Sequence, residues 1–116
     1  MGILDFFRSG NSLKIKIQNI KKDFEIIISK VCPEKFSILQ YGEYKISPKY
    51  LVFWITVKTD DMKLKLSSDV NLNNELREVL IHHDYPKEHL DDVQIGFESQ
   101  ETVDRESNGD WYLHFK

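Results

Sequence analysis

The stretch Tyr50-Leu51-Val52-Phe53-Trp54-Ile55-Thr56-Val57-Lys58-Thr59 decides the fold, because its β-branched and aromatic residues give the strongest strand signal in the chain. Asp60-Asp61 and the alternating run 62–66 (Met-Lys-Leu-Lys-Leu) follow it directly. A two-residue turn there would place Leu64 opposite Val57 and Leu66 opposite Ile55, on one buried face. The stretch therefore predicts a hairpin formed by residues 50–59 and 62–66.

The predicted strand is apolar on both faces over half its length. Tyr50, Val52 and Trp54 lie on the face opposite Leu51, Phe53, Ile55 and Val57. An apolar second face needs a cover, which a terminal segment such as Phe6-Phe7 would supply. The alternative is a contact with a partner or with a second copy of the chain, so Tyr50, Val52 and Trp54 form a candidate homodimer interface.

Two amphipathic helices are predicted, one before this strand in the sequence and one after it. Between Ser12 and Val31 apolar residues recur at spacings of four and three, the stripe of a helix. The alternation in residues 13–17 is compatible with a strand, but a cap at Asn11 or Ser12 and Pro33 beyond the end favour the helix. A second stripe, in residues 72–80, follows Asn71 as a cap and ends before residues 85–86 (Tyr-Pro).

The remaining segments are predicted as strands. Residues 36–46 form a strand interrupted by a bulge or bend at Gly42, and residues 93–97 alternate as another. Residues 107–110 (Ser-Asn-Gly-Asp) indicate a closing hairpin. The order α-β-β-β-α-β-β predicts an α+β fold in one domain over residues 1–116, with an antiparallel sheet of about five strands and both helices on one face.

Charge and cysteine content bound the functional classes. The net charge of −3 hides an asymmetry, because residues 1–58 carry +5 and residues 59–116 carry −8. The halves either attract each other within the fold or leave an acidic surface for a basic partner. A pI near 5.8 argues against nucleic acid as a partner. Cys32 is the only cysteine, which fits a reducing, cytoplasmic location, and Asp5 within the apolar opening argues against a signal peptide or membrane segment.

The predicted closing hairpin has an acidic outer face. A three-residue loop sets Leu113 opposite Val103 and Trp111 opposite Arg105. Glu106 then lies directly opposite Asp110, an unfavourable pair unless solvent, a cation or a basic partner compensates. On that outer face we expect Thr102, Asp104, Glu106, Asp110, Tyr112 and His114. The candidate partner-binding residues are Glu98, Glu101, Asp104, Glu106, Asp110, Trp111 and Tyr112.

Enzymatic chemistry has little support in the sequence. No phosphate-binding loop, nucleophile elbow or zinc-ligand spacing occurs, so we expect neither a catalytic residue nor a cofactor. His82, His83 and His89 could form a weak metal site, although neighbouring helical residues point about 100° apart. The alternative function is a small metal-dependent hydrolase or nuclease that uses Glu98, Glu101 and Asp104.

A resemblance adds a specific expectation. Residues 98–106 (Glu-Ser-Gln-Glu-Thr-Val-Asp-Arg-Glu), followed by residues 108–113 (Asn-Gly-Asp-Trp-Tyr-Leu), look like the C-terminal part of small bacterial proteins. The whole chain resembles the immunity proteins of contact-dependent and polymorphic toxin systems. This resemblance implies a cytosolic inhibitor that binds a toxin domain, commonly a basic nuclease, by complementary charge and shape. It identifies no catalytic residue.

Overall fold

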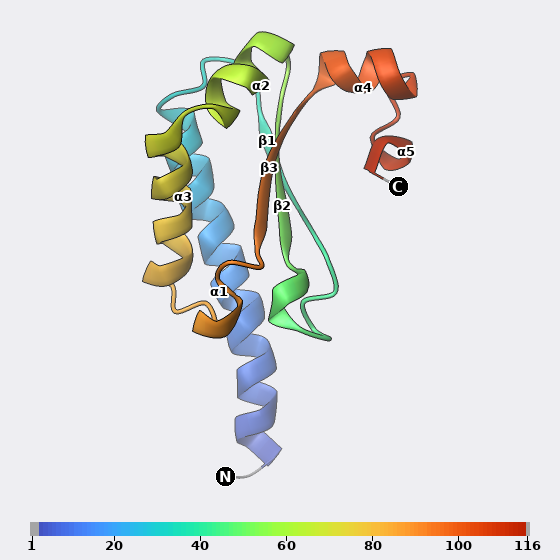
Figure 1. The fold of residues 1–116 in the computed structure, drawn as a ribbon. Helices are drawn as coiled ribbons and strands as arrows, with labels where there is room; N and C mark the ends of the chain where they lie inside the picture. The colour runs from blue at the N-terminus through green and yellow to red at the C-terminus, as the bar shows by residue number, and fades with distance from the viewer. Residues whose placement is uncertain (1–2, 116) are drawn as a thin grey trace.

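The computed structural model describes residues 3–115, and within residues 3–12 the helical backbone alone. In chain order the elements are α1 (Ile3–Ser29), β1 (Ser37–Tyr41), the short 3-10 helix η1 (Pro48–Tyr50), β2 (Val52–Val57), α2 (Asp60–Ser67), α3 (Val70–His82), the 3-10 helix η2 (Lys87–His89), β3 (Gln94–Ser99), α4 (Gln100–Ser107) and α5 (Trp111–Phe115) (Figure 1). The fold is α+β, as the sequence predicts. None of the helices in the described part of the chain is both long and apolar enough to cross a bilayer.

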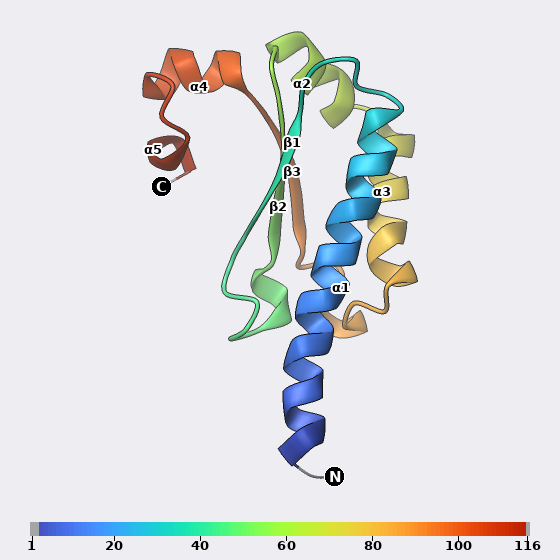
Figure 2. The same ribbon diagram turned by 180° about the vertical axis from the view of Figure 1, so that it is seen from behind.

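The sheet of the described residues has three strands in the order β1-β2-β3. β2 pairs antiparallel with β1, with Ile55 opposite Ile38, and parallel with β3, with Ile55 opposite Phe97. The parallel pair requires a crossover, which α2 and α3 supply. Helices α1 and α3 lie side by side on one face of the sheet, whereas α4 and α5 lie on the other side (Figures 1 and 2). The expected sheet of about five antiparallel strands is not confirmed, because the sheet of the described residues has three strands and its β2–β3 pair is parallel.

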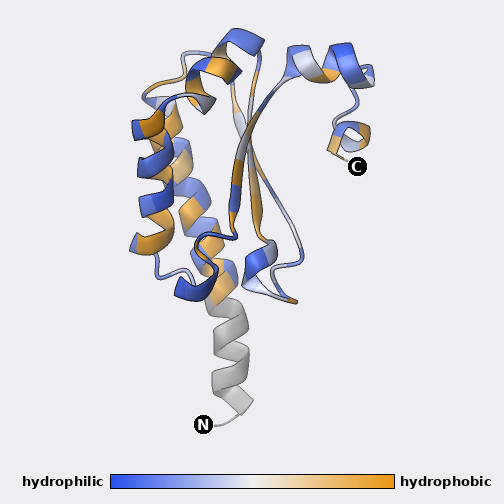
Figure 3. Ribbon diagram, viewed as in Figure 1, coloured by the Kyte–Doolittle hydropathy of each residue, from blue (hydrophilic) through white to orange (hydrophobic). Residues whose placement is uncertain are grey.

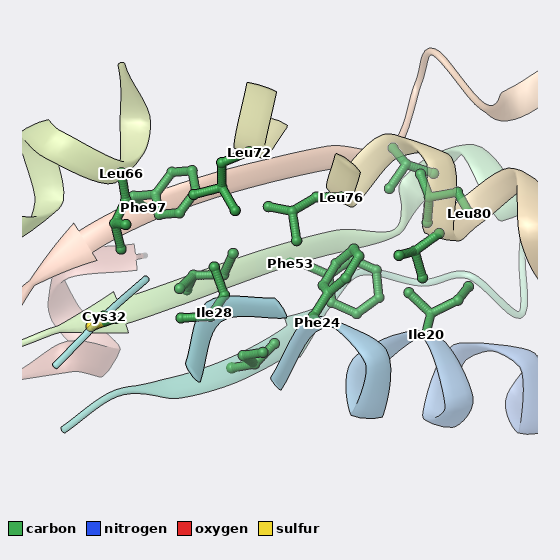
Figure 4. Close-up of a cluster of buried hydrophobic side chains, with 14 of the residues drawn as sticks. Ile20, Phe24, Ile28, Cys32, Phe53, Leu66, Leu72, Leu76, Leu80 and Phe97 are labelled. Atoms are coloured by element: carbon green, nitrogen blue, oxygen red, sulfur yellow. The ribbon is translucent and has the colours of Figure 1, made fainter. Parts of the chain in front are cut away.

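The core lies between the sheet and the α1–α3 layer. Phe24 of α1 meets Phe53 of β2 edge to face, with ring centroids 4.9 Å apart, and both residues are fully buried (Figure 4). Leu76 and Leu80 bring the apolar stripe of α3 to the same cluster. Apolar and polar residues alternate around both helices, as a helix with one buried face requires (Figure 3). Burial of these stripes holds the helices on the sheet.

The predicted segments around this core are confirmed with shifted boundaries. The helix expected from Ser12 begins earlier, at Ile3, while the second helix is capped by the side chain of Asp69 instead of Asn71. The expected break at Gly42 is present, with φ of +102° and a position that would put a Cβ 1.8 Å from the carbonyl oxygen of Tyr50. Glycine is required there, because any side chain would collide with that backbone.

Residues 62–66 form a helix, which corrects the predicted hairpin. The side chain of Thr59 accepts a hydrogen bond from the backbone N–H of Met62, so Thr59 is an N-cap and Asp60 and Asp61 fill the first turn of α2. Negative charge is favourable at that end of a helix. Leu66 is buried but Leu64 is exposed, so the pairs Val57–Leu64 and Ile55–Leu66 do not form.

The closing hairpin is also wrong, because two helices occupy its place. Ser99 caps α4, and its side chain accepts from the backbone N–H of Thr102. Asn108 and Gly109 have positive φ values, but they end α4 in the left-handed conformation common at helix C-termini. The predicted cross-strand pairs are therefore absent, namely Leu113 with Val103, Trp111 with Arg105, and Glu106 with Asp110.

Candidate functional site

The sheet face opposite α1 and α3, here called the open face, carries a row of aromatic and apolar residues. Strand register places Leu39, Trp54 and Gly96 side by side across the three strands. A Cβ at Gly96 would lie 2.6 Å from the Trp54 ring. The indole therefore lies against the backbone of Gly96, and the absence of a side chain at Gly96 leaves room for the Trp54 ring.

Helix α5 covers part of the open face. The ring of Phe115 stacks on Trp54 with centroids 4.7 Å apart and lies 5.9 Å from the ring of Tyr41. Trp111, one turn earlier, donates from Nε1 to Oε1 of Gln100 at 2.8 Å. The cover that the apolar second face of β2 requires thus comes from α5. The side chains of Phe6 and Phe7, expected to supply it, lie outside the described residues.

The carboxylate of Glu98 fixes α5 to the sheet. It accepts hydrogen bonds from Lys63 Nζ at 2.6 Å and from the backbone N–H of Ser99 at 2.9 Å, and lies 2.8 Å from His114 Nε2. Burial raises the pKa of Glu98, but the hydrogen bonds from Lys63, His114 and Ser99 outweigh burial, so the pKa lies below its usual value. We call this group the Glu98 clamp. Because Glu98 is only 8% exposed, it is not part of an acidic surface.

A second network joins the beginnings of α2 and α4, at the carboxyl ends of the parallel strands β2 and β3. The carboxylate of Asp60 accepts from the hydroxyl of Ser99 at 2.5 Å, from Thr102 at 2.6 Å and from Arg105 at 2.9 Å. These hydrogen bonds hold the pKa of Asp60 far below its usual value. Glu101 accepts from the backbone N–H of Asp60 at 2.8 Å, which closes the connection. The network orients α4 on the end of the sheet.

Four predicted partner-binding carboxylates remain in solvent, and we call them the acidic α4–α5 surface. They are Glu101, Asp104, Glu106 and Asp110, all exposed. Asp104 accepts a hydrogen bond from Gln100 and Asp110 accepts one from the backbone N–H of Leu113, but none of the four is in an ion pair of the described residues. The adjacent cation, Arg105, is paired with Asp60. Negative charge therefore dominates the exposed side of α4.

The expected shared face is only partly formed. Thr102 is buried in the Asp60 network and His114 is half-buried in the Glu98 clamp, so both are turned away from the expected outer face. Tyr112 is 74% exposed, as expected. Trp111 is half-buried and faces Phe115, with ring centroids 5.6 Å apart.

Two hollows flank α5 on the open face. The first, of about 600 Å³, is lined by Lys35, Phe36, Ser37, Leu39, Thr56, Val57, Lys58, Gln100 and Trp111. The second, of about 400 Å³, is lined by Tyr41, Val52, Trp54, Gln94, Tyr112 and Phe115. Volumes of this size suit a small ligand or the side chains of a partner.

The candidate homodimer residues belong to two elements, η1 and β2. Tyr50 lies in η1 before the strand, with its ring under the ammonium of Lys49. Val52 and Trp54 line the second hollow, where Phe115 already stacks on the indole. The expectation that all three share one strand face is therefore wrong, because the strand begins at Val52.

The candidate metal ligands are engaged separately. His83 Nε2 lies 2.6 Å from a carboxylate oxygen of Asp23, and His89 Nδ1 lies 3.2 Å from Asp92. His82 meets His83 edge to face, with perpendicular rings. In the residues that the structure describes, no three His, Cys, Asp or Glu side chains gather in a way that could hold an ion. The carboxylates of the hydrolase hypothesis, Glu98, Glu101 and Asp104, likewise bind three different sets of partners.

Sequence reasoning missed the polar residues that organise this end of the fold, namely Lys63, Gln100 and the caps Thr59 and Ser99. A cap signal was present, because each of these two hydroxyl residues stands at or just after the end of a strand and has an acidic residue within the next two positions. No family model matches the chain, and no curated protein or solved structure matches it.

Proposed function

We propose that this chain is a non-enzymatic protein-binding module that recognises a basic protein through the acidic α4–α5 surface. In this proposal it acts as a cytosolic immunity protein that neutralises a basic, nuclease-like toxin domain. The observation that supports it is the group of four exposed carboxylates on α4 and at the start of α5, none of them in an ion pair of the described residues.

Such a surface affects both the rate and the selectivity of protein binding. Clustered charges of one sign accelerate encounter with a partner of opposite sign and disfavour partners of the same sign. Their reach is about 8 Å at physiological salt. A nuclease site that binds phosphates is rich in cations, so a cluster of carboxylates is complementary to it.

The surface is also held in place before any partner arrives. The Asp60 network fixes α4, whereas the Glu98 clamp and the Trp54–Phe115 stack fix α5. Binding therefore loses little conformational entropy in this region. Tyr112 of α5 is exposed, and tyrosine is enriched where interfaces derive most of their affinity.

Amide substitution tests the proposal with little structural damage. The variant Glu101→Gln, Asp104→Asn, Glu106→Gln and Asp110→Asn removes four negative charges and keeps every acceptor oxygen used in the fold. The matched control removes four exposed carboxylates around α3 and η2, with the substitutions Glu75→Gln, Glu78→Gln, Glu88→Gln and Asp91→Asn. Both proteins and the parent serve as bait in the native host at low and high salt, and captured proteins are purified and titrated.

The expected result is capture of a basic protein by the parent and by the control, lost in the α4–α5 amide variant and at high salt. Three results overturn the proposal. They are capture that is insensitive to salt, equal capture by the α4–α5 amide variant, and no captured protein of basic character.

A further inference from the structure

The first hollow differs in charge from the acidic surface beside it. Lys35 and Lys58, which precede β1 and follow β2, both line the hollow and are both exposed. Neither is in an ion pair of the described residues. Glu34, a neighbouring carboxylate, accepts from the backbone N–H groups of Lys58 and Thr59 and from the Thr59 hydroxyl, so its hydrogen bonds go to the loop instead of the ammonium groups.

The walls of the hollow are apolar and fixed. Leu39 and Phe36 contribute from β1 and the residue before it, and Trp111 contributes from α5. The indole cannot turn freely, because its N–H is bonded to the carbonyl oxygen of Gln100, whose amide nitrogen donates to Asp104. A rigid aromatic side chain and a leucine side chain suit the apolar part of a small ligand, either a planar ring system or an alkyl chain.

The hydroxyls of Ser37 and Thr56 form the polar floor of the hollow and use both of their protons. Thr56 donates from its hydroxyl to the carbonyl oxygen of Ser37 at 3.2 Å, and the two hydroxyls are 2.6 Å apart. With the Thr56 proton used in this way, the Ser37 hydroxyl donates to Thr56 Oγ1. The floor then offers only lone pairs, so an anionic group is favoured at the lysines and not at the floor.

We propose that the first hollow binds a small amphiphilic anion. Its apolar body lies against Leu39, Phe36 and Trp111, and its carboxylate, sulfonate or phosphate group lies between Lys35 and Lys58. The volume of about 600 Å³ is ordinary for sites of small molecules. This site has the opposite charge to the proposed toxin-binding surface and is lined by different residues, but Gln100, which holds Trp111, also donates to Asp104 of that surface.

Two probes test the site in the full chain. Anilinonaphthalene sulfonate reports binding by its own emission, and decanoate competes with it. Decylamine and decanol have an alkyl chain of similar length, with a positively charged head group and with an uncharged hydroxyl. We expect decanoate to displace the dye and the amine and the alcohol to displace it at least about tenfold more weakly.

Lysine substitutions provide the decisive comparison. The variant Lys35→Met with Lys58→Met is expected to bind decanoate at least about tenfold more weakly. The control, Lys45→Met with Lys87→Met, removes two exposed lysines outside the hollow and is expected to bind like the parent. Cooperative urea unfolding confirms that each variant is folded. The proposal is overturned if the Lys35/Lys58 variant binds like the parent, if decylamine competes as well as decanoate, or if neither anion binds.

Discussion

Replacement of Lys63 by methionine isolates the energy of the Glu98 clamp. The side chain of Glu98 is 10% exposed and that of Lys63 is 32% exposed. Loss of one partner from a fully buried ion pair costs about 3–5 kcal/mol, because an uncompensated charge stays buried. His114 and the N–H of Ser99 still contact Glu98, and Lys63 is partly hydrated, so we expect a loss of about 2 kcal/mol, within the range for hydrogen bonds to charged groups.

Urea and thermal unfolding measure this loss. A destabilisation of about 2 kcal/mol in a domain of this size lowers Tm by about 8 °C. Lys65→Met is the matched control, since Lys65 is exposed on the same helix and has no ion pair in the described residues, and it is expected to change Tm little. The double variant Lys63→Met with Glu98→Gln is expected to lose less free energy of unfolding than the two single variants lose together, because a neutral amide needs no counter-charge.

The pH dependence has a definite sign. The pKa of Glu98 lies below its usual value in the folded parent, so the clamp stabilises the fold above the ordinary glutamate pKa of about 4.3. Without Lys63, burial raises that pKa, and protonation relieves the buried charge as pH falls. The difference between parent and Lys63→Met should therefore shrink from pH 7 toward pH 4. A Tm loss no larger than that of Lys65→Met, or an additive double variant, would refute this account.

Three further predictions follow from the same geometry. The urea midpoint of the parent should fall as pH drops below about 4. Asp60 and Glu98 have lowered pKa values in the folded protein, so their stabilisation is present above the unfolded-state pKa and is lost in acid. A urea midpoint that stays constant with pH would contradict this prediction. Gly42→Ala should cost about 2–4 kcal/mol in urea unfolding through a backbone collision at positive φ, and an unchanged midpoint would exclude that collision. Phe115→Ala should cost about 1–2 kcal/mol and shift Trp54 emission to longer wavelength when the other tryptophan is phenylalanine; unshifted emission would show that α5 does not cover the ring.

The long periodic segments of this fold were predictable from the sequence. The stripe in α1 extends over many turns, and strands β2 and β3 contain the β-branched and aromatic residues typical of buried strands. Gly42 was predictable as a break because a glycine inside a strand pattern usually marks one. In these cases local preference and tertiary packing favour the same structure.

The short segments were not predictable from alternation. In a run of five residues, positions i and i+4 share a face in a strand and in a helix alike. Met62 and Leu66 are such a pair, and so are Trp111 and Phe115, so both runs fit a hairpin and also fit the helices α2 and α5. The cap residues before α2 and α4 favour a helix over a strand in those segments. The position of α5 depends on a tertiary contact, the stacking of Phe115 on Trp54.

The acidic character of the candidate site was predictable from the sequence, but the particular carboxylates that are exposed there were not. The sequence shows a surplus of carboxylates near the carboxyl end, and four of them are exposed. It does not show that Glu98 is buried against Lys63, because that contact joins residues from β3 and α2 through the crossover. Which charges face solvent is set by tertiary structure.

The crossover between β2 and β3 has a consequence for folding kinetics. Val52 and Gln94 must pair across the whole of α2 and α3, so the central strand keeps one edge unpaired until a distant part of the chain returns. Such non-local closure slows folding, and a bare strand edge in the waiting intermediate can pair with another molecule. Refolding of this protein is therefore expected to be slow for its size and to lose yield as protein concentration rises.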